Sequence, residues 1–207
     1  MTIYSLRLFK SKETPILLAY SEDISSFPFY ARITNSPSEF LLFTSRTFAE
    51  NIHPGNFEAC IKGDYAIFVH HRLDGLISVI ITDRLYPKRV AFEVISKAVK
   101  LFKAEDHNWD WELWEEDSEN GYNVSNQKLT KLIEDYSEPD KEDNLLKVSN
   151  QLSETKEIMG NSVNKLLERG DKIDELVDKS KDLSRKSKDF YKKSKQMNSW
   201  CGSCLIM

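Results

Sequence analysis

Apolar residues recur at alternating spacings of three and four along the last third of this 207-residue chain. The spacing predicts a coiled-coil helix that buries one seam against other helices. Five seam positions hold Ser or Thr, whereas a two-stranded zipper prefers bulky aliphatic side chains, so the pattern favours a bundle of several helices. The ten apolar seam positions are Leu145, Val148, Leu152, Met159, Leu166, Ile173, Leu176, Leu183, Phe190 and Met197.

A single arginine, Arg169, occupies a seam position near the middle of the pattern. One interpretation is that its stem packs on the seam while the charge reaches solvent. The other is that the guanidinium is enclosed, and it then needs hydrogen-bond acceptors from neighbouring helices. The spacing continues without interruption through Leu166 and Ile173, which favours the enclosed position. Such a polar layer would also fix the register of the bundle.

The coiled-coil segment is not expected to persist as a lone helix. Gly160 and Gly170 each cost about 1 kcal/mol relative to alanine, and an isolated amphipathic helix has nothing against which to bury its seam. Prolines stop at Pro139, where the globular pattern ends. We therefore divide the chain into a globular domain, a linker, a coiled-coil segment and a tail, over residues 1–136, 137–143, 144–199 and 200–207.

The globular part has the pattern of a mixed α and β domain. Apolar runs predict five strands, near residues 3–9, 16–20, 57–61, 65–71 and 76–82. Helical spacing predicts helices from Ser36 to about His53, from about Pro87, and over residues 127–136. Short turns separate the last three strands, which implies antiparallel neighbours. The expected fold class is α+β, a five-stranded antiparallel sheet flanked by helices.

An acidic segment over residues 105–119 carries eight acids, no lysine or arginine, and three tryptophans at positions 109, 111 and 114. Tryptophan buries a large area whatever its role. We therefore favour a surface segment pinned to the domain by its tryptophans over a ligand platform.

Several classes of protein do not fit the sequence. No apolar stretch reaches the roughly 18 residues of a membrane span, the first residues lack the apolar centre of a secretory signal, and no glycine-rich phosphate loop is present. Cys60 lies in a strand-like run where a buried, inert thiol is expected, and the adjacent His70 and His71 face opposite ways on a strand. We expect no catalytic residues, no cofactor, no metal site and no nucleic-acid partner.

The final residues, Cys204-Leu205-Ile206-Met207, fit a prenylation signal, and the terminal methionine favours a farnesyl group on Cys204. One lipid chain gives only marginal, reversible membrane binding, so stable anchoring needs a second signal. Cys201 is a candidate for reversible palmitoylation. Residues 179–195, with eight basic residues and two acids, are another candidate because they would be attracted to anionic lipids.

Two parts of the chain resemble known domains. The coiled-coil segment resembles the SNARE motif of the synaptobrevin-like R-SNAREs in the stretch SETKEIMGNSVNKLLERGDKIDELVDKS. The globular part resembles the longin domain in IYSL, DISSFPFY, EFLLFTSRT and YPKRVAFEVI. Together they resemble the prenylated longin R-SNAREs of the Ykt type, a family without a membrane span.

The resemblance implies a longin (profilin-like) fold and a v-SNARE function. The segment would zipper with three Q-SNARE helices to drive fusion of vesicle and target membranes in ER–Golgi, endosomal or vacuolar transport, with Arg169 at the central ionic layer. A lipid on Cys204 would then pull the two membranes together. The implied location is the cytosol and the cytoplasmic face of Golgi, endosome, vacuole and vesicle membranes.

The resemblance also implies an intramolecular contact, in which the longin domain folds back on the SNARE segment and the lipid and shields both. Phe43, within EFLLFTSRT, is then expected to present its ring to an autoinhibitory groove beside the first helix. The alternative is that Phe43 only packs on the sheet.

Two other functions stay open. The chain could be a longin scaffold that tethers or sorts without fusing membranes, and Arg169 would then be dispensable for complex formation. The family has also been credited with promoting palmitoyl transfer, for which the residues of this chain offer no support.

Overall fold

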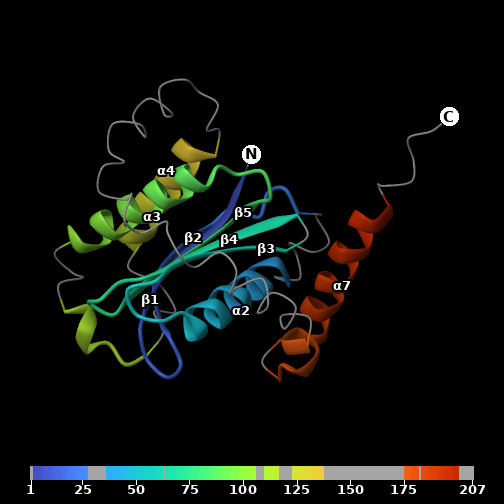
Figure 1. Cartoon of the computed structure of the whole chain (residues 1–207), viewed down its shortest axis with the longest axis horizontal. Helices are drawn as coiled ribbons and strands as arrows, with labels where there is room; N and C mark the ends of the chain where they lie inside the picture. Colours follow the sequence, from blue (N-terminus) through green and yellow to red (C-terminus); the bar gives the residue numbers. More distant parts are fainter. Residues whose placement is uncertain are drawn as a thin grey trace.

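The computed structural model describes residues 2–27, 36–62, 64–105, 110–116, 123–137, 175–181 and 183–200. Five strands form one sheet in the order β2-β1-β5-β4-β3, and every neighbouring pair is antiparallel (Figure 1). The strands are β1 (Ile3–Lys10), β2 (Ile16–Glu22), β3 (Phe57–Lys62), β4 (Tyr65–His71) and β5 (Leu76–Asp83). The predicted α+β class with a five-stranded antiparallel sheet is confirmed.

Helices cover both faces of the sheet, so the inner strands are buried on both sides. In Figure 1, α3 (Lys88–Lys103) and α4 (Asn123–Tyr136) lie on one face, and α2 (Ser36–Asn51) lies on the other with α7 (Arg185–Trp200) beside it. Successive side chains of β4 point to opposite faces of the sheet. Phe68 therefore packs under α3 and α4, whereas its neighbours Ile67 and Val69 pack under α2.

The helix boundaries follow local sequence signals. Ser36 and Pro37 open α2, as predicted, and Pro87 precedes the first residue of α3. Two tight turns use glycine at positive φ, at Gly55 (79°) and Gly75 (84°). The final helix of the domain, α4, begins at Asn123, four residues before the predicted start.

The acidic segment is pinned to the domain through its tryptophans. A 3-10 turn, η2 (Trp111–Leu113), places Trp111 in the core under α3 and α4, and Trp114 packs against the same core while half-buried. The Lys10 ammonium donates to the carbonyl oxygens of Glu112 and of Trp114, the latter at 2.8 Å. The packing role is confirmed for these two tryptophans, whereas Trp109 lies outside the described residues.

A polar clamp holds the last residue of α4, where the globular domain meets the linker. The Tyr86 hydroxyl donates to the carbonyl oxygen of Tyr136 at 2.8 Å, and the Tyr136 hydroxyl donates to Glu93 at 2.9 Å. Lys97 donates to the same hydroxyl and pairs with Glu93 at 2.8 Å. The clamp therefore joins the β5–α3 loop, α3 and the end of α4.

The coiled-coil segment is broken within the part that the structure describes. Residues 175–179 form one helical turn, residues 180, 181, 183 and 184 are not helical, and α7 begins at Arg185. Residues 144–174 lie outside the described ranges. The expectation that this segment does not persist as a lone helix stays a prediction, because α7 is packed against the globular domain here.

Candidate functional site

Helix α7 docks on α2 and on Phe27, which follows β2, through three contacts between aromatic rings. The Phe190 ring lies 5.5 Å from the Phe27 ring and 6.1 Å from the Phe40 ring, both edge to face, and the Tyr191 ring lies 5.1 Å from Phe40. Edge-to-face and tilted pairs at these separations are favourable. Phe190 and Tyr191 are only 8% and 9% exposed, and their burial depends on the globular domain.

The docked face of the segment overlaps the predicted seam without matching it. Leu183 and Phe190 are buried, but Leu176 is 40% exposed, and Val177, one residue off the seam, is fully buried in the α2-side core. The seam residue Met197 lies in α7, and nothing is described of its side chain. The other seam positions, from Leu145 to Ile173 and including Arg169, lie outside the described residues.

A carboxylate on α2 meets the first residues of α7. Glu39 accepts hydrogen bonds from the Ser184 backbone N–H at 2.5 Å, from the Ser184 hydroxyl at 2.7 Å and from the Ser187 hydroxyl. Burial alone would raise the pKa of Glu39, but the hydrogen bonds from Ser187 and Ser184 outweigh it and lower the pKa below the ordinary value. Glu39 is therefore held as an anion that binds the start of α7.

A buried ion pair supports the first turn of α2. The Arg7 guanidinium, on β1, donates to Glu22 on β2 at 2.6 Å, and the Ser38 hydroxyl donates to the other oxygen of the Glu22 carboxylate. Desolvation lowers the pKa of Arg7, and Glu22 opposes that shift. Ser38 is thus tied to the two strands beside it, and its neighbour Glu39 is positioned with it.

A second set of contacts holds the helical turn 175–179 to α7. The Lys188 ammonium donates to the carbonyl oxygen of Asp178 at 3.2 Å and to that of Ser180. Lys192 pairs with the Asp178 carboxylate at 2.9 Å. Both partners of the Lys192–Asp178 pair are more than half exposed, so solvent screens it and its contribution is small.

The predicted groove residue Phe43 is half-buried and packs against the core on the α2 side of the sheet. The ring contacts to α7 come from Phe40, three residues earlier in the helix. The predicted helix from Ser36 to about His53 includes Glu39 and Phe40, but the sequence pattern gives neither residue a role in docking. The autoinhibitory role of Phe43 stays a prediction.

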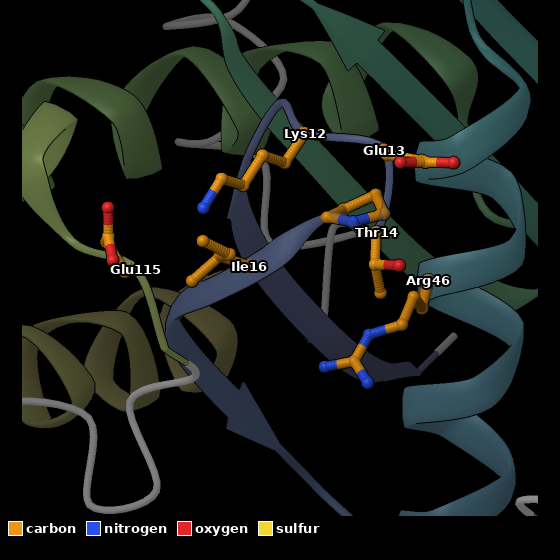
Figure 2. Close-up of a pocket in the computed structure, with 7 residues that line it drawn as sticks. Lys12, Glu13, Thr14, Ile16, Arg46 and Glu115 are labelled. Carbon is orange, nitrogen blue, oxygen red and sulfur yellow. The ribbon is translucent and has the colours of Figure 1, made fainter.

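A separate pocket of about 510 Å³ lies at the β1–β2 turn, with Arg46 of α2 and Glu115 on its walls (Figure 2). Two basic and two acidic side chains balance one another on its walls, so the pocket favours neither anions nor cations and we assign it no ligand. Its lining residues are Lys12, Glu13, Thr14, Pro15, Ile16, Arg46 and Glu115.

The remaining sequence-predicted residues are not part of the α2–α7 interface. Cys60 is 1% exposed and lies in the core on β3. His70 stacks on Phe57, whereas the ring of His71 bonds to the carbonyl oxygen of Ile52, so the two histidines do face opposite ways. Cys201 and Cys204 lie outside the described residues.

Neither a metal site nor a membrane-spanning helix is found in the part of the chain that the structure describes. No three of its His, Cys, Asp and Glu side chains gather as a metal cluster would require. None of its helices combines the length and the apolar character needed to cross a bilayer.

Comparison with known proteins assigns both halves of the chain. Residues 27–127 match the longin, or regulated-SNARE-like, domain, and residues 144–203 match synaptobrevin. The synaptobrevin homologues named ykt6 in Schizosaccharomyces pombe and YKT6 in Debaryomyces hansenii and Saccharomyces cerevisiae are each 33% identical over 178 residues, which is 86% of either chain. The chain belongs to the Ykt-type longin R-SNAREs. The expected longin fold is thereby confirmed, and this R-SNARE has a SNARE role in vesicle transport.

Proposed function

We propose that this R-SNARE drives membrane fusion by zippering residues 144–199 with three Q-SNARE helices, with Arg169 at the ionic layer of the bundle. The lipid that anchors it is a prenyl group on Cys204, reinforced by palmitate on Cys201 or by the basic residues 179–195. The chain exchanges between a closed form in the cytosol and an open form on the cytoplasmic face of Golgi, endosomal, vacuolar and vesicle membranes.

One observation supports a closed form above all others. Leu183, Ser187 and Phe190 are seam positions that a four-helix bundle would bury, and all three are already buried in the isolated chain, at 5%, 0% and 8% exposure. Phe190 and Ser187 reach this state through α2, by ring packing and by the bond to Glu39. The same surface cannot pack against α2 and against Q-SNARE helices at once, so docking and zippering exclude each other.

The energies favour the bundle once partners are present. Fully burying one large apolar side chain contributes about 1.5 to 3 kcal/mol, and the docked form buries only part of the seam. A bundle that buries ten apolar layers gains several times as much, and this gain can offset the cost of ordering the helix. The longin domain therefore delays assembly without preventing it.

The decisive experiment mixes the full chain with three Q-SNARE helices and measures a heat-resistant four-chain complex. We expect the complex to form, and to form faster when the longin domain is removed. Arg169→Leu should yield a less stable complex. Arg169→Lys, which keeps the charge, should reduce the stability of the complex by a smaller amount. Failure of the wild-type segment to enter any such complex, or full tolerance of Arg169→Leu, would favour the tethering scaffold instead.

The lipid proposal has its own measurement. Mass spectrometry of the C-terminal peptide from cells should find a farnesyl group on Cys204 and a separate, labile palmitate on Cys201. A peptide without any lipid would refute the anchoring mechanism and leave the zippering test untouched. We propose no catalytic step, because the Cys60 thiol that acyl transfer would need is enclosed in the core.

A further inference from the structure

The start of α7 carries the wrong charges for a free helix end. The first turn of α7 contains no acidic residue, and Arg185, Lys186 and Lys188 are all basic. The N-terminus of a helix bears a partial positive charge, which basic residues destabilise and acidic residues stabilise. The sequence of α7 therefore does not supply the anion that would stabilise a helix beginning at Arg185.

The anion comes instead from the longin domain. Ser184 provides the local cap, because its hydroxyl accepts the Ser187 N–H at 3.2 Å and its carbonyl oxygen accepts the Lys188 N–H at 3.1 Å. Glu39, some 145 residues earlier in the chain, then accepts the Ser184 N–H and both serine hydroxyls. In a capping box a glutamate three residues into the same helix accepts the N-cap N–H, and here a glutamate on α2 does so.

We propose that Glu39 is a helix cap supplied across the interface, and that it stabilises the broken form of the SNARE segment in which α7 begins at Arg185. This inference rests on the proposed closed form and names the residue that selects it. It assigns Glu39 a positioning role, distinct from the apolar packing of Phe40, Phe190 and Tyr191.

The cap discriminates between two forms of the segment. In one continuous helix the Ser184 N–H would bond to the carbonyl oxygen of Ser180, four residues back. In the structure that N–H bonds to Glu39, and the Ser180 carbonyl is taken by the Lys188 ammonium. Each of the two backbone groups that a continuous helix would join therefore has another partner in the broken form. A group that binds one of two conformations shifts the population toward it, so Glu39 opposes the uninterrupted helix that zippering requires.

The cap is held in place by the buried pair beneath it. Glu22 accepts hydrogen bonds from Arg7 and from Ser38, the residue before Glu39. The first turn of α2 therefore presents its carboxylate from a fixed position. A carboxylate that is already positioned gives up little conformational entropy when it binds the start of α7.

The test uses the full chain alone and measures hydrogen–deuterium exchange of the backbone amides of residues 188–193. Glu39→Ala should speed their exchange about tenfold, because a cap and its charge-assisted hydrogen bonds are lost together. Glu39→Gln should fall between Ala and the wild type. The matched control is Glu50→Gln, the same charge change about 16 Å further along α2, and it should leave α7 protected.

A second variant avoids any effect on α2 itself. Ser184→Ala removes one partner of Glu39 from the other side, and when it is combined with Glu39→Ala the loss of protection should be smaller than the sum of the single effects. Amides of β5 should stay equally protected in every variant, as the measure that the domain is folded. Unchanged α7 protection in Glu39→Ala, or strictly additive effects in the double variant, would overturn the proposal.

The outcome can be separated from that of the proposed function because no Q-SNARE helix is present. If the wild-type chain fails to assemble with Q-SNARE helices while Glu39→Ala still loses α7 protection, the fusion proposal is refuted and the helix-cap proposal is supported. If the chain assembles but Glu39→Ala leaves the exchange of the α7 amides unchanged, only the helix-cap proposal is refuted. Rapid α7 exchange in the wild type would overturn the cap directly.

Discussion

At the scale of single residues, Arg7 is a charged side chain that the domain buries. Its side chain is 3% exposed and its charge is balanced by Glu22, which is 18% exposed. Removing one partner of a buried pair leaves the other charge without compensation, and this costs far more than the pair contributes. The Tyr20 ring and the Ser5 hydroxyl also contact the guanidinium.

Replacing Arg7 with Met should lower the free energy of unfolding by about 3 to 5 kcal/mol, measured by urea denaturation. The control is Arg72→Met, which breaks a pair with Asp74 whose side chains are 39% and 28% exposed, and this change should cost less than about 1 kcal/mol. Adding Glu22→Gln to Arg7→Met should restore part of the loss. Equal losses for Arg7→Met and Arg72→Met would show that burial does not set the cost.

At the scale of elements, one surface of α7 packs against α2 in the structure and would pack against Q-SNARE helices in the proposed bundle. Phe190 is buried by α2 in the structure, and it is also a layer of the proposed bundle. Leu176 is a layer of the bundle too, but it is 40% exposed in the structure. The two residues therefore separate docking from zippering.

Phe190→Ala should weaken α7 docking by about 2 kcal/mol, which corresponds to a ~30-fold rise in the exchange rate of the α7 amides. Leu176→Ala should leave that exchange nearly unchanged. Both substitutions should lower the melting temperature of the four-chain complex. A loss of α7 protection in Leu176→Ala as large as that in Phe190→Ala would contradict this separation.

The elements also show what sequence patterns can and cannot predict. Strands such as β5 were predictable because their apolar residues, such as Ile80 and Ile81, lie on both faces of a covered sheet. Helix α2 was predictable because Ser36 and Pro37 mark its start. The start of α4 was missed since Asn123 to Asn126 carry no helical apolar spacing. The seam was predictable as a pattern, but its contact with Phe40 and Glu39 was not, because periodicity says which side of a helix is apolar and not which distant helix covers it.

At the scale of the whole molecule, the sheet separates two apolar layers that are covered by different parts of the chain. The layer under α3 and α4 is closed by the globular domain itself. The layer under α2 is completed by Val177, Phe190 and Tyr191 from the SNARE segment. Opening the chain therefore exposes apolar surface on one face of the domain only.

A chain ending at Ser137 should remain folded and bind more of a hydrophobic fluorescent dye than the full chain, because Phe27 and Phe40 lose their cover. Phe40→Ser in the shortened chain should reduce that binding. The control is Leu85→Ser, since Leu85 is 77% exposed in the intact chain and its exposure does not depend on α7. Equal dye binding by the full and shortened chains would show that α7 does not cover this face.

The clamp around Tyr136 has a mechanical consequence. Once α7 has left α2, tension in the chain beyond Ser137 reaches the domain at the end of α4, where Tyr86, Glu93 and Lys97 hold Tyr136 from two other segments. The hydrogen bonds pass part of this force to α3 and to the β5–α3 loop, which oppose the separation of α4 from the domain. We therefore expect the domain to stay folded while its tail is pulled, because these hydrogen bonds must break before α4 can separate from it.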